Sequence, residues 1–574
     1  MEEQKSILSV EQLSISFVDK EGKNCVVNNL SFELHKGQTI GLVGESGSGK
    51  SVSMMSVMRL LNEKKVEYSG RIVFHKDGKD IDLLSLKPSQ IRTMRGSRIA
   101  MIFQEPMTSL NPSMLCGEQV MESLRLHLKM NRQQAEQRTL ELFKEVLLPD
   151  PKKVFQSYPH EISGGQKQRV MIAMAMACNP DILIADEPTT ALDVTVQKTI
   201  IELMKTLQKN HNMSIIFITH DLGVVAQIAD DILVLYRGKK VEEGPVKTIF
   251  SHPQHAYTKG LLACRVPLDK RPKKLLTVSD FMSADNQALS NQLAVEEITL
   301  QERQAEIEKI MTCQPVLQVK NLCKSYELPK KWFAKQLYFD AVRNVSFDVF
   351  EGETLGLVGE SGCGKTTLGR LILRLIEPTS GQVLYQGEDI YQMKAERLRK
   401  LRKDIQVVFQ DPYSSLNPRY TIGHAITEPM KLHGIGKNDA ERKEMVMNLL
   451  EKVNLEQKYF YSYPHEFSGG QRQRVCIARA LALQPKFLIC DESVSALDVS
   501  VQAQVLNLLN QLKKEFQLTY IFISHDLSVV KYMSHRILVM HKGAIQELNE
   551  ADQLYAHPQT QYTRTLIDAI PKIE

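Results

Sequence analysis

The sequence predicts an α/β protein in which two similar domains follow one another along the chain. Three observations lead to this prediction. The same order of motifs occurs twice, apolar strand-like runs alternate with longer amphipathic stretches, and each copy contains the pattern strand–GxxxxGK[ST]–helix. The chain has 574 residues, which at about 150 residues per domain leaves room for both copies. We expect a first domain over residues 8–263, a partly helical linker over 264–314 and a second domain over 315–574.

Composition places the chain among ordinary globular proteins and argues against several functions. Hydrophobic residues make up 43% and charged residues 24%, and the net charge of +5 is too small at this length to indicate a nucleic-acid partner. The nine cysteines include no Cys-x-x-Cys pair, which argues against a zinc or iron–sulfur site and favours a reducing compartment. The acidic N-terminus is unlike a signal peptide, and no apolar run reaches the roughly 18 residues that span a bilayer. A membrane role would therefore need partner chains.

The duplication covers whole domains, because the offset between matching residues stays constant over long stretches. Lys365 follows Lys50 by 315 residues, whereas Asp491 follows Asp186 by 305, and the second offset then holds to the end of the repeat. Each change of offset marks a difference in length between the copies. We assign these differences to surface loops, because changes of length there cost little.

Each domain opens with a stretch that alternates apolar and polar residues, at 8–17 and 316–326. This alternation is typical of strands, and we expect them to form an antiparallel subsheet. The stretches end in Phe17 and Tyr326. An aromatic ring at such a place is ordinarily part of the core, but the motifs that follow favour a second interpretation, in which adenine stacks on the ring.

A glycine-rich loop follows the next apolar strand in both copies. In a strand–GxxxxGK[ST]–helix pattern the glycines let backbone N–H groups curl around a phosphate, the lysine bridges the outer phosphates, and the Ser or Thr hydroxyl is a ligand for Mg²⁺. Two such loops in the same context predict two ATP sites, and we interpret Cys363 as a small filler of its loop. The loop residues are Gly44, Glu45, Ser46, Gly47, Ser48, Gly49, Lys50 and Ser51 in the first copy, and Gly359, Glu360, Ser361, Gly362, Cys363, Gly364, Lys365 and Thr366 in the second.

Each copy then has a glutamine at the end of a strand. The surrounding sequences are Gln104-Glu-Pro-Met-Thr-Ser-Leu-Asn-Pro and Gln410-Asp-Pro-Tyr-Ser-Ser-Leu-Asn-Pro. The amide of such a glutamine can reach Mg²⁺ and the attacking water, whereas an isolated glutamine would be an ordinary surface residue. The repeat of the whole context favours the functional interpretation. Residues 118–150 and 424–457 have charged faces and predict a helical subdomain after each glutamine.

A Ser-Gly-Gly-Gln sequence starts the helix that follows each helical subdomain. The serine is a suitable helix N-cap, and the glycines let a phosphate approach the positive end of the helix. Because each domain already has its own phosphate loop, we expect this helix start to serve the nucleotide of the other domain. The residues are Ser163, Gly164, Gly165 and Gln166 in the first copy, and Ser468, Gly469, Gly470 and Gln471 in the second.

Two buried strands in each copy end in charged or titratable side chains. One ends in Asp186-Glu187 or Asp491-Glu492, where the aspartate suits the Mg²⁺ shell and the glutamate suits general-base work on the attacking water. The other ends in a histidine, 34 residues after the aspartate in both copies. A single histidine there would ordinarily be structural, but the repeated spacing indicates a sensor of the γ-phosphate. These histidines are His220 and His525.

The linker between the domains consists of two stretches of different composition. Residues 266–284 contain Pro, Lys, Asp and Ser and predict a loop, whereas residues 286–311 carry Leu, Ile and Val three and four apart and predict a helix. We interpret residues 264–314 as a tether, because a tether raises the effective concentration of one domain near the other.

In this order the motifs closely resemble those of the ATP-binding-cassette (ABC) ATPases, over nearly all of both domains. The resemblance implies two tandem P-loop NTPase domains, each with a mixed-sheet core, an antiparallel β subdomain and an α-helical subdomain. These domains would close head to tail around two ATP molecules, so that each phosphate loop faces the Ser-Gly-Gly-Gln sequence of the other domain, with Asp193 and Asp498 at the interface. Neither copy lacks a catalytic element, so we expect two competent hydrolytic sites.

Three further features are shared by both copies: the Leu-Asn-Pro context after each glutamine, Tyr-Pro-His-Glu before each Ser-Gly-Gly-Gln, and a tail that runs from His252 to Tyr257 or from His557 to Tyr562. Together they resemble the ATPase subunits of dipeptide, oligopeptide, glutathione and nickel importers. This resemblance implies a peripheral subunit on the cytoplasmic face of the cell membrane, working with two membrane permeases and an extracytoplasmic solute-binding protein. The cysteine-rich segment that holds an iron–sulfur cluster in some members does not occur here, so we expect no cluster.

The main alternative is a tandem-cassette ATPase that acts on ribosomes, which shares the duplication and the lack of apolar spans. The transporter-like context after each glutamine and the modest charge argue against it. A DNA-repair cassette protein is disfavoured because zinc-spaced cysteines are missing. The transported solute and the direction of transport stay open, because a cassette fold alone fixes neither.

Overall fold

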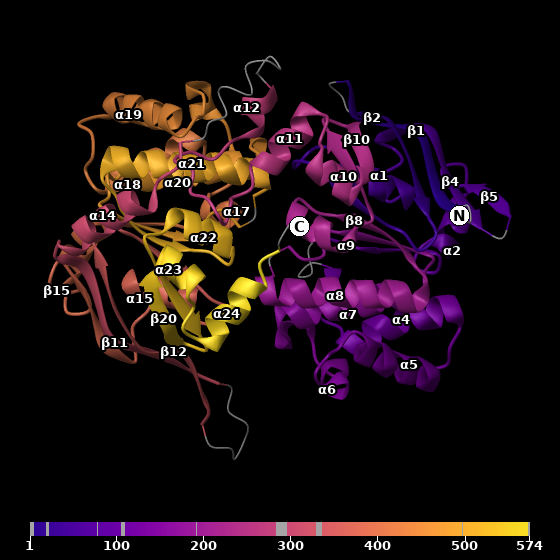
Figure 1. The fold of residues 1–574 in the computed structure, drawn as a ribbon, viewed down its shortest axis with the longest axis horizontal. Helices are drawn as coiled ribbons and strands as arrows, with labels where there is room; N and C mark the ends of the chain where they lie inside the picture. Colours follow the sequence, from indigo (N-terminus) through magenta and orange to yellow (C-terminus); the bar gives the residue numbers. More distant parts are fainter. Residues whose placement is uncertain are drawn as a thin grey trace.

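The structure is a computed structural model that describes residues 5–18, 22–76, 78–104, 109–190, 192–282, 296–328, 336–495 and 497–571. The first half, up to residue 263, and the second half, from residue 315, have the same order of elements and lie side by side (Figure 1). The linker, 264–314, connects them in sequence, and the structure describes its residues 264–282 and 296–314.

Each half carries a four-stranded antiparallel sheet, and the strands predicted at 8–17 and 316–326 are confirmed as parts of β1 and β11. In β1 the residues from Ile7 to Val10 are all buried, so both faces of this stretch are covered, whereas Glu11 is exposed. The orders are β2-β1-β4-β5 and β12-β11-β14-β15. The strands are β1 (Ser6–Val18), β2 (Lys23–His35), β4 (Val66–Lys76), β5 (Lys79–Asp82), β11 (Pro315–Glu327), β12 (Tyr338–Phe350), β14 (Ser380–Tyr385) and β15 (Glu388–Asp389).

The second sheet of each half is mixed, with five parallel strands and one antiparallel edge strand. Its central strands are buried along their whole length because helices cover one face, and the antiparallel sheet together with the first helix covers the other. The orders are β6-β7-β8-β3-β9-β10 and β16-β17-β18-β13-β19-β20, which bring the carboxyl ends of the central parallel strands to one edge. The strands are β3 (Thr39–Val43), β6 (Ile99–Ile102), β7 (Ile182–Asp186), β8 (Ser214–Ile218), β9 (Asp231–Tyr236), β10 (Lys239–Pro245), β13 (Thr354–Val358), β16 (Ile405–Val408), β17 (Phe487–Asp491), β18 (Thr519–Ile523), β19 (Arg536–His541) and β20 (Ala544–Glu550).

Helices cover these sheets, and the helices predicted within 118–150 and 424–457 are confirmed as α4 with α5 and α18 with α19. The helices of the first half are α1 (Lys50–Val57), α2 (Pro88–Met94), α4 (Cys116–Leu128), α5 (Arg132–Glu145), α6 (Pro151–Phe155), α7 (Gly164–Met176), α8 (Val194–His211), α9 (Leu222–Ile228), α10 (Val246–Ser251), α11 (Ala256–Ala263) and the 3₁₀ turn Pro159–Glu161. Those of the second half are α15 (Lys365–Ile372), α16 (Ala395–Asp404), α17 (Pro412–Ser415), α18 (Ile422–Leu432), α19 (Asp439–Lys452), α20 (Gly469–Leu481), α21 (Val499–Phe516), α22 (Leu527–Met533), α23 (Ala551–Ala556), α24 (Gln561–Asp568) and the 3₁₀ turns Gln457–Tyr461 and Pro464–Glu466. None of the helices in the described ranges has both the length and the apolar character to cross a membrane.

The linker differs in part from its prediction. The expected loop over 266–284 contains a short helix, α12 (Val278–Met282), which forms because Val278 and Phe281 bury their side chains against α11. The expected helix over 286–311 is confirmed only as α14 (Leu300–Met311). It is wrong for residues 296–299, where Glu297 bridges to Pro272 and Thr299 caps α14, and residues 286–295 lie outside the described ranges.

The linker is attached to the second half through buried cations. Arg303 on α14 is 7% exposed, and its Nε lies 3.0 Å from Asp552 and 3.2 Å from Glu550. Arg271, 9% exposed, lies 3.4 Å from the same Asp552 and donates to backbone carbonyls at the end of α22. Two arginines that share one carboxylate fix the linker to the second half, while its role as a tether stays a prediction.

Candidate active site

Each phosphate loop wraps around its own lysine. Lys50 Nζ donates hydrogen bonds to the carbonyl oxygens of Gly44 at 2.7 Å and Glu45 at 2.9 Å, and Lys365 repeats both bonds in its own loop at the same distances. A Cβ on Gly44, where φ is +151°, would lie 2.2 Å from the Leu235 carbonyl oxygen, so a larger residue does not fit beneath β9. The loop therefore holds the ammonium group in a fixed place at the start of the helix.

The predicted Mg²⁺ ligands lie together at the carboxyl ends of the strands. Ser51 Oγ donates to Asp186 Oδ1 at 3.0 Å, and Thr366 Oγ1 donates to Asp491 Oδ1 at 3.4 Å. Burial is the main cause that raises the pKa of each aspartate to about 6. A hydroxyl beside a carboxylate is an oxygen ligand set of the kind that Mg²⁺ prefers, and a cation there would offset the cost of burying the charge. These residues fit the predicted metal role, which stays a prediction.

Glu187 is the centre of a hydrogen-bond network in the first half. Gln104 Nε2 donates to its Oε2 at 3.1 Å, Thr190 Oγ1 donates to the same oxygen at 2.8 Å, and His220 Nδ1 lies 3.2 Å from Oε1. Burial alone would raise the pKa of Glu187, but the bonds from His220 and Thr190 outweigh it and lower the pKa to about 2. The φ of +48° at Glu187 is a strained conformation for a residue with a side chain, and such strain is often stored at functional sites.

The second half repeats this network with one difference. Gln410 Nε2 donates to Glu492 Oε2 at 2.6 Å, and His525 Nδ1 lies 3.6 Å from the same oxygen. Ser495 occupies the place of Thr190 but donates its hydroxyl to the backbone carbonyl of Glu492, at 2.9 Å. The structure thus brings the predicted glutamine, glutamate and histidine together in both halves, while the two carboxylates receive different sets of hydrogen bonds.

The two halves touch through the residues predicted at the interface. Asp498 Oδ2 accepts a hydrogen bond at 3.1 Å from the backbone N–H of Ser46, which belongs to the phosphate loop of the first half. Asp193 Oδ2 accepts the matching bond from Ser361 N at 3.3 Å. The other carboxylate oxygen of each aspartate caps its own helix, α21 or α8. Each aspartate therefore links a helix start in one half to the phosphate loop of the other half.

The next residues along these helices add a second reciprocal contact between the halves. Thr195 Oγ1 donates to Glu360 Oε1 at 3.2 Å, and Ser500 Oγ donates to Glu45 Oε1. Burial raises the pKa of Glu45, although its hydrogen bond from Ser500 opposes the increase. These hydroxyl residues were not predicted from the sequence, because their partners lie in the opposite half.

The Ser-Gly-Gly-Gln sequences cap their own helices as predicted. Ser163 Oγ accepts from Gln166 N at 3.3 Å, Gln166 Oε1 accepts from Ser163 N at 3.0 Å, and Ser468 and Gln471 form the same pair of bonds. Within the described ranges the side chains of both serines bond only to their own helix starts, so the predicted approach to the opposite phosphate loop stays a prediction. Gly164 and Gly469 face open space, whereas Gly165 and Gly470 lie against the valine that follows Asp193 or Asp498 by three residues.

A cavity of about 360 Å³ lies over the phosphate loop of the second half, a size that suits a nucleotide-sized ligand. The predicted adenine platform Tyr326, which is 40% exposed, lines it, and so does Asp193 from the other half. Other predicted site residues that line this cavity are Ser361, Gly362, Gly364, Lys365, Thr366, Gln410, Glu492 and His525. The equivalent Phe17 is half-buried and packs against the apolar cluster of its antiparallel sheet. Cys363 is 5% exposed beneath the loop, in agreement with its interpretation as a filler.

Two tyrosines support the phosphate loops from the C-terminal part of each half. Tyr257 on α11 is fully buried, and its hydroxyl oxygen accepts a hydrogen bond at 2.8 Å from Glu45 N. Tyr562 on α24 accepts the matching bond from Glu360 N at 3.1 Å. In the sequence these tyrosines stand out only as parts of a repeated tail. The signal that could have predicted their role is the spacing between the two tyrosines, which is the same 305 residues that separate Asp186 from Asp491.

Comparison with known proteins decides the family. The model of the family described as "ABC transporter" matches residues 27–190 and 342–495, more than half of the chain. The chain belongs to the ABC transporter family. A second model, "Oligopeptide/dipeptide transporter, C-terminal region", matches residues 241–287 and 546–574, which include both tail tyrosines of this ABC protein.

Curated ABC proteins match along nearly the whole length. "Glutathione import ATP-binding protein GsiA" of Salmonella choleraesuis (strain SC-B67) is 46% identical over 99% of this chain and 90% of the relative. The protein of the same name from Escherichia coli (strain K12) is 47% identical with the same coverage. Among solved structures, the dimeric post-hydrolysis state of the ATP-binding cassette MJ0796 bound to ADP and Pi is 30% identical, covers 41% of this chain and 98% of that chain, and has a TM-score of 0.38.

These matches confirm the predicted family, the tandem ABC ATPase fold and ATP hydrolysis coupled to transport of the peptide-importer type. They favour the importer over the ribosome-acting alternative. The boundaries near residues 263 and 314 and the roles of the individual site residues stay predictions.

Proposed function

We propose that the two halves of this chain form a head-to-tail ATPase pair that binds and hydrolyses ATP at two composite sites. The observation that carries the proposal is the reciprocal contact in which Asp498 binds the Ser46 amide and Asp193 binds the Ser361 amide. Each phosphate loop is then sensitive to the position of the other half. ATP entering a loop would draw the opposite Ser-Gly-Gly-Gln helix start toward its phosphates, because that helix end carries partial positive charge.

The chemistry of each site follows from its hydrogen-bond network. Lys50 and the loop N–H groups bind the phosphates, and Ser51 with Asp186 would hold Mg²⁺, which when bound supplies charge stabilisation to the phosphoryl oxygens. Glu187 accepts a proton from the attacking water, Gln104 and His220 hold its carboxylate in place through their contacts with it, and His220 senses the γ-phosphate. Lys365, Thr366, Asp491, Glu492, Gln410 and His525 do the same work in the second half.

The hydrolytic cycle would energise import through two permeases on the cytoplasmic face of the membrane, with a solute-binding protein on the other side. Large aromatic rings are exposed beside each glutamine: Phe103 is 44%, Phe409 37% and Tyr413 65% exposed. Exposed rings of this kind suit contact with another protein, and here they would receive cytoplasmic loops of the permeases. Since curated relatives carry glutathione import in their names, glutathione or a similar short peptide is the solute that we assign.

The test measures uptake and partners in the same cells. Cells that lack the chain are given the wild type, the double variant Glu187→Gln with Glu492→Gln, or the exposed-surface control Glu136→Gln, and uptake of labelled glutathione and of a dipeptide is compared. We expect uptake with the wild type and the control and loss with the double variant. A pull-down of each tagged chain should recover two multi-span permeases. Recovery of ribosomal proteins without a permease, or undiminished uptake with the double variant, would contradict the proposal.

A further inference from the structure

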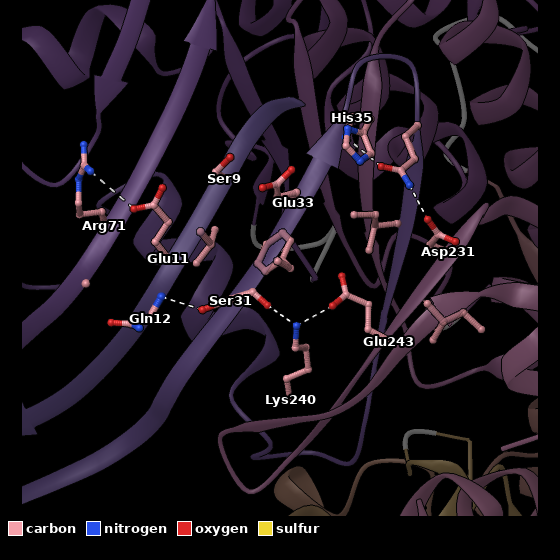
Figure 2. Close-up of a pocket in the computed structure, with 16 residues that line it drawn as sticks. Ser9, Glu11, Gln12, Ser31, Glu33, His35, Arg71, Asp231, Lys240 and Glu243 are labelled. Atoms are coloured by element: carbon pink, nitrogen blue, oxygen red, sulfur yellow. Dashed lines mark hydrogen bonds and ion pairs between the residues drawn. The ribbon is translucent and has the colours of Figure 1, made fainter. Parts of the chain in front are cut away.

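A polar cavity of about 770 Å³ lies in the first half, away from the phosphate loop. It is bounded by β1 and β2 of the antiparallel sheet and by β9 and β10 of the mixed sheet (Figure 2). Gln38 and Asp231 lie near the amino ends of β3 and β9, whereas the phosphate loop follows the carboxyl end of β3. Because β3 has five residues, the cavity and the ATP site are about 15 Å apart along this strand.

The second half fills the equivalent place with its own guanidinium group. Arg536, the first residue of β19, donates from Nε to Glu353 Oε1 at 2.7 Å and from Nη2 to Glu353 Oε2 at 3.0 Å. The same Nη2 donates to the Asp348 carbonyl oxygen at 2.8 Å, and the guanidinium carbon lies 5.1 Å from the centre of the Phe350 ring. Glu353 is 1% exposed, so this is a buried cation held by a carboxylate, a carbonyl and an aromatic face.

The first half has no cation at this position, although the surrounding strands pair in the same register. Asp231 stands where Arg536 stands in the other copy, and Gln38 stands where Glu353 stands. Gln38 keeps the local hydrogen bond of its counterpart. Its Oε1 accepts from His35 N at 2.8 Å, and in the second half Glu353 Oε2 accepts from Phe350 N at 2.9 Å. Two neighbouring positions also differ in polarity: they are Lys240 and Glu243 in the first half, and isoleucine and leucine in the second. The hollow therefore results from side-chain replacement within one duplicated scaffold.

The cavity has more negative than positive charge left to bind a ligand. Its two basic side chains are already paired, Lys240 with Glu243 at 2.6 Å and Arg71 with Glu11 at 3.6 Å (Figure 2). Asp231 receives a neutral donor, Gln38 Nε2, at 2.6 Å. Burial raises the pKa of Asp231, and the negative charges of Asp230 and Glu243 raise it further. An added cation would relieve this repulsion.

One imidazole atom is also left without a partner. His35 Nδ1 is buried and makes no hydrogen bond to any described residue, and the ring stands where the second half places the Phe350 ring against its guanidinium. Asp231, Glu33 and the flat His35 ring therefore surround the volume that the Arg536 side chain takes up in the other copy.

We propose that this cavity binds a guanidinium group from outside the chain, which takes the place that Arg536 occupies in the second half. Asp231 supplies the charged acceptor, the Glu33 carbonyl corresponds to the Asp348 carbonyl, and the His35 ring lies against the planar cation. The ligand is a small guanidinium compound or an arginine side chain presented on a peptide. The site shares no lining residue with the cavity over the phosphate loop of the second half.

The experiment titrates the full chain with agmatine, which carries a guanidinium group, and with N-carbamoylputrescine, which has the same chain and ammonium group but a neutral urea in place of the guanidinium. Calorimetry should detect saturable binding of agmatine and none of N-carbamoylputrescine. Asp231→Asn should weaken agmatine binding about tenfold or more, because it removes a charge-assisted bond. The double variant Gln38→Glu with Asp231→Arg installs the pair of the second half, and it should abolish agmatine binding while ATP binding persists. Glu136→Gln, which removes one surface charge elsewhere, should bind agmatine like the wild type.

A blocked arginine tripeptide distinguishes the two sources of the cation. Tighter binding of the tripeptide than of agmatine supports an arginine side chain of a partner, whereas tighter binding of agmatine supports a free small molecule. Failure of both probes to bind a chain that still binds ATP would overturn the proposal. Agmatine binding that survives in the double variant would overturn it as well, because the cation would then lie elsewhere.

Discussion

A buried histidine makes the stability of the second half dependent on pH. His535 is 6% exposed, its Nδ1 accepts a hydrogen bond from Thr354 N at 2.8 Å, and its Nε2 lies 3.5 Å from Glu306 on the linker helix α14. Nδ1 must be unprotonated to accept this bond. Burial, helped by the nearby charge of Lys513, lowers the pKa of His535 to about 4. In the unfolded chain the imidazole has its ordinary pKa of 6.5.

The sign and size of the effect follow from these two values. Between pH 6.5 and about 4 the unfolded chain binds a proton at His535 that the folded chain does not, so acid favours unfolding. The stabilising contribution is complete above pH 6.5 and is lost as the pH falls toward 4. At about 1.4 kcal/mol per pKa unit, the total loss is about 3 kcal/mol of unfolding free energy. His535→Asn keeps an oxygen that can accept from Thr354 and has no proton to gain, so it should be nearly independent of pH in this window.

The assay is amide hydrogen exchange, because a chain with two halves need not unfold in one step. Opening free energies are compared between β13 with β19 in the second half and β3 with β9 in the first. The first half is an internal reference, since Asp230 accepts the matching bond from Thr39 N at 2.8 Å. His557→Asn, at an exposed histidine, is the matched control and should behave like the wild type. Equal pH slopes in the wild type and His535→Asn would refute the reasoning.

Three further predictions test the catalytic residues, the interface and the local fit of the backbone. Glu187→Gln with Glu492→Gln should lower ATP turnover about 10²–10⁴-fold with ATP binding retained, as measured by phosphate release and nucleotide titration; turnover at the wild-type rate would exclude a general-base role. Asp498→Ala removes an interface hydrogen bond and a helix cap, so it should lower the free energy of unfolding by about 1–2 kcal/mol. It should also slow ATP hydrolysis at the first-half site more than at the second-half site, as measured in chains in which the other site is disabled. Gly356→Ala places a methyl group 2.4 Å from an α22 side chain and should lose about 1–3 kcal/mol in calorimetry. In Gly369→Ala on α15 the new methyl group meets nothing closer than 3.6 Å, so the free energy of unfolding should rise by about 0.5–1 kcal/mol. Destabilisation by both substitutions would contradict the idea that the space around each glycine decides the effect.

The sequence predicted those parts of the site that are local in the chain. A phosphate loop, a helix cap such as Ser163 and a strand ending in Asp186-Glu187 are each specified within a few residues, so spacing alone predicts their geometry. Duplication strengthened every one of these predictions, because a chance pattern does not recur at a constant offset. The network of Gln104, Glu187 and His220 was accessible for a related reason: parallel strands bring their carboxyl ends to one edge.

Features made by contacts between distant segments were not accessible. The hydrogen bond from Glu45 N to the Tyr257 hydroxyl joins the phosphate loop to α11, and no local sequence pattern specifies it. The attachment of the linker by Arg271 and Arg303 depends on a carboxylate in the second half, so the composition of the linker suggested only a loop and a helix. The cavity beside Asp231 was also hidden, because each half looks unremarkable until its side chains are compared position by position in space.

The two interface bonds from hydroxyl groups show what covalent fusion permits. A cassette that pairs with an identical copy must use the same residue on both sides of its two-fold axis, so any change there is made twice. In this chain the contact to Glu360 comes from Thr195, whereas the contact to Glu45 comes from Ser500. Because the two halves belong to one chain, each half always pairs with the same partner half. A substitution at one contact therefore has to be accommodated only by the surface that faces it. Fusion thereby releases the halves to evolve unequal strengths at sites of shared ancestry.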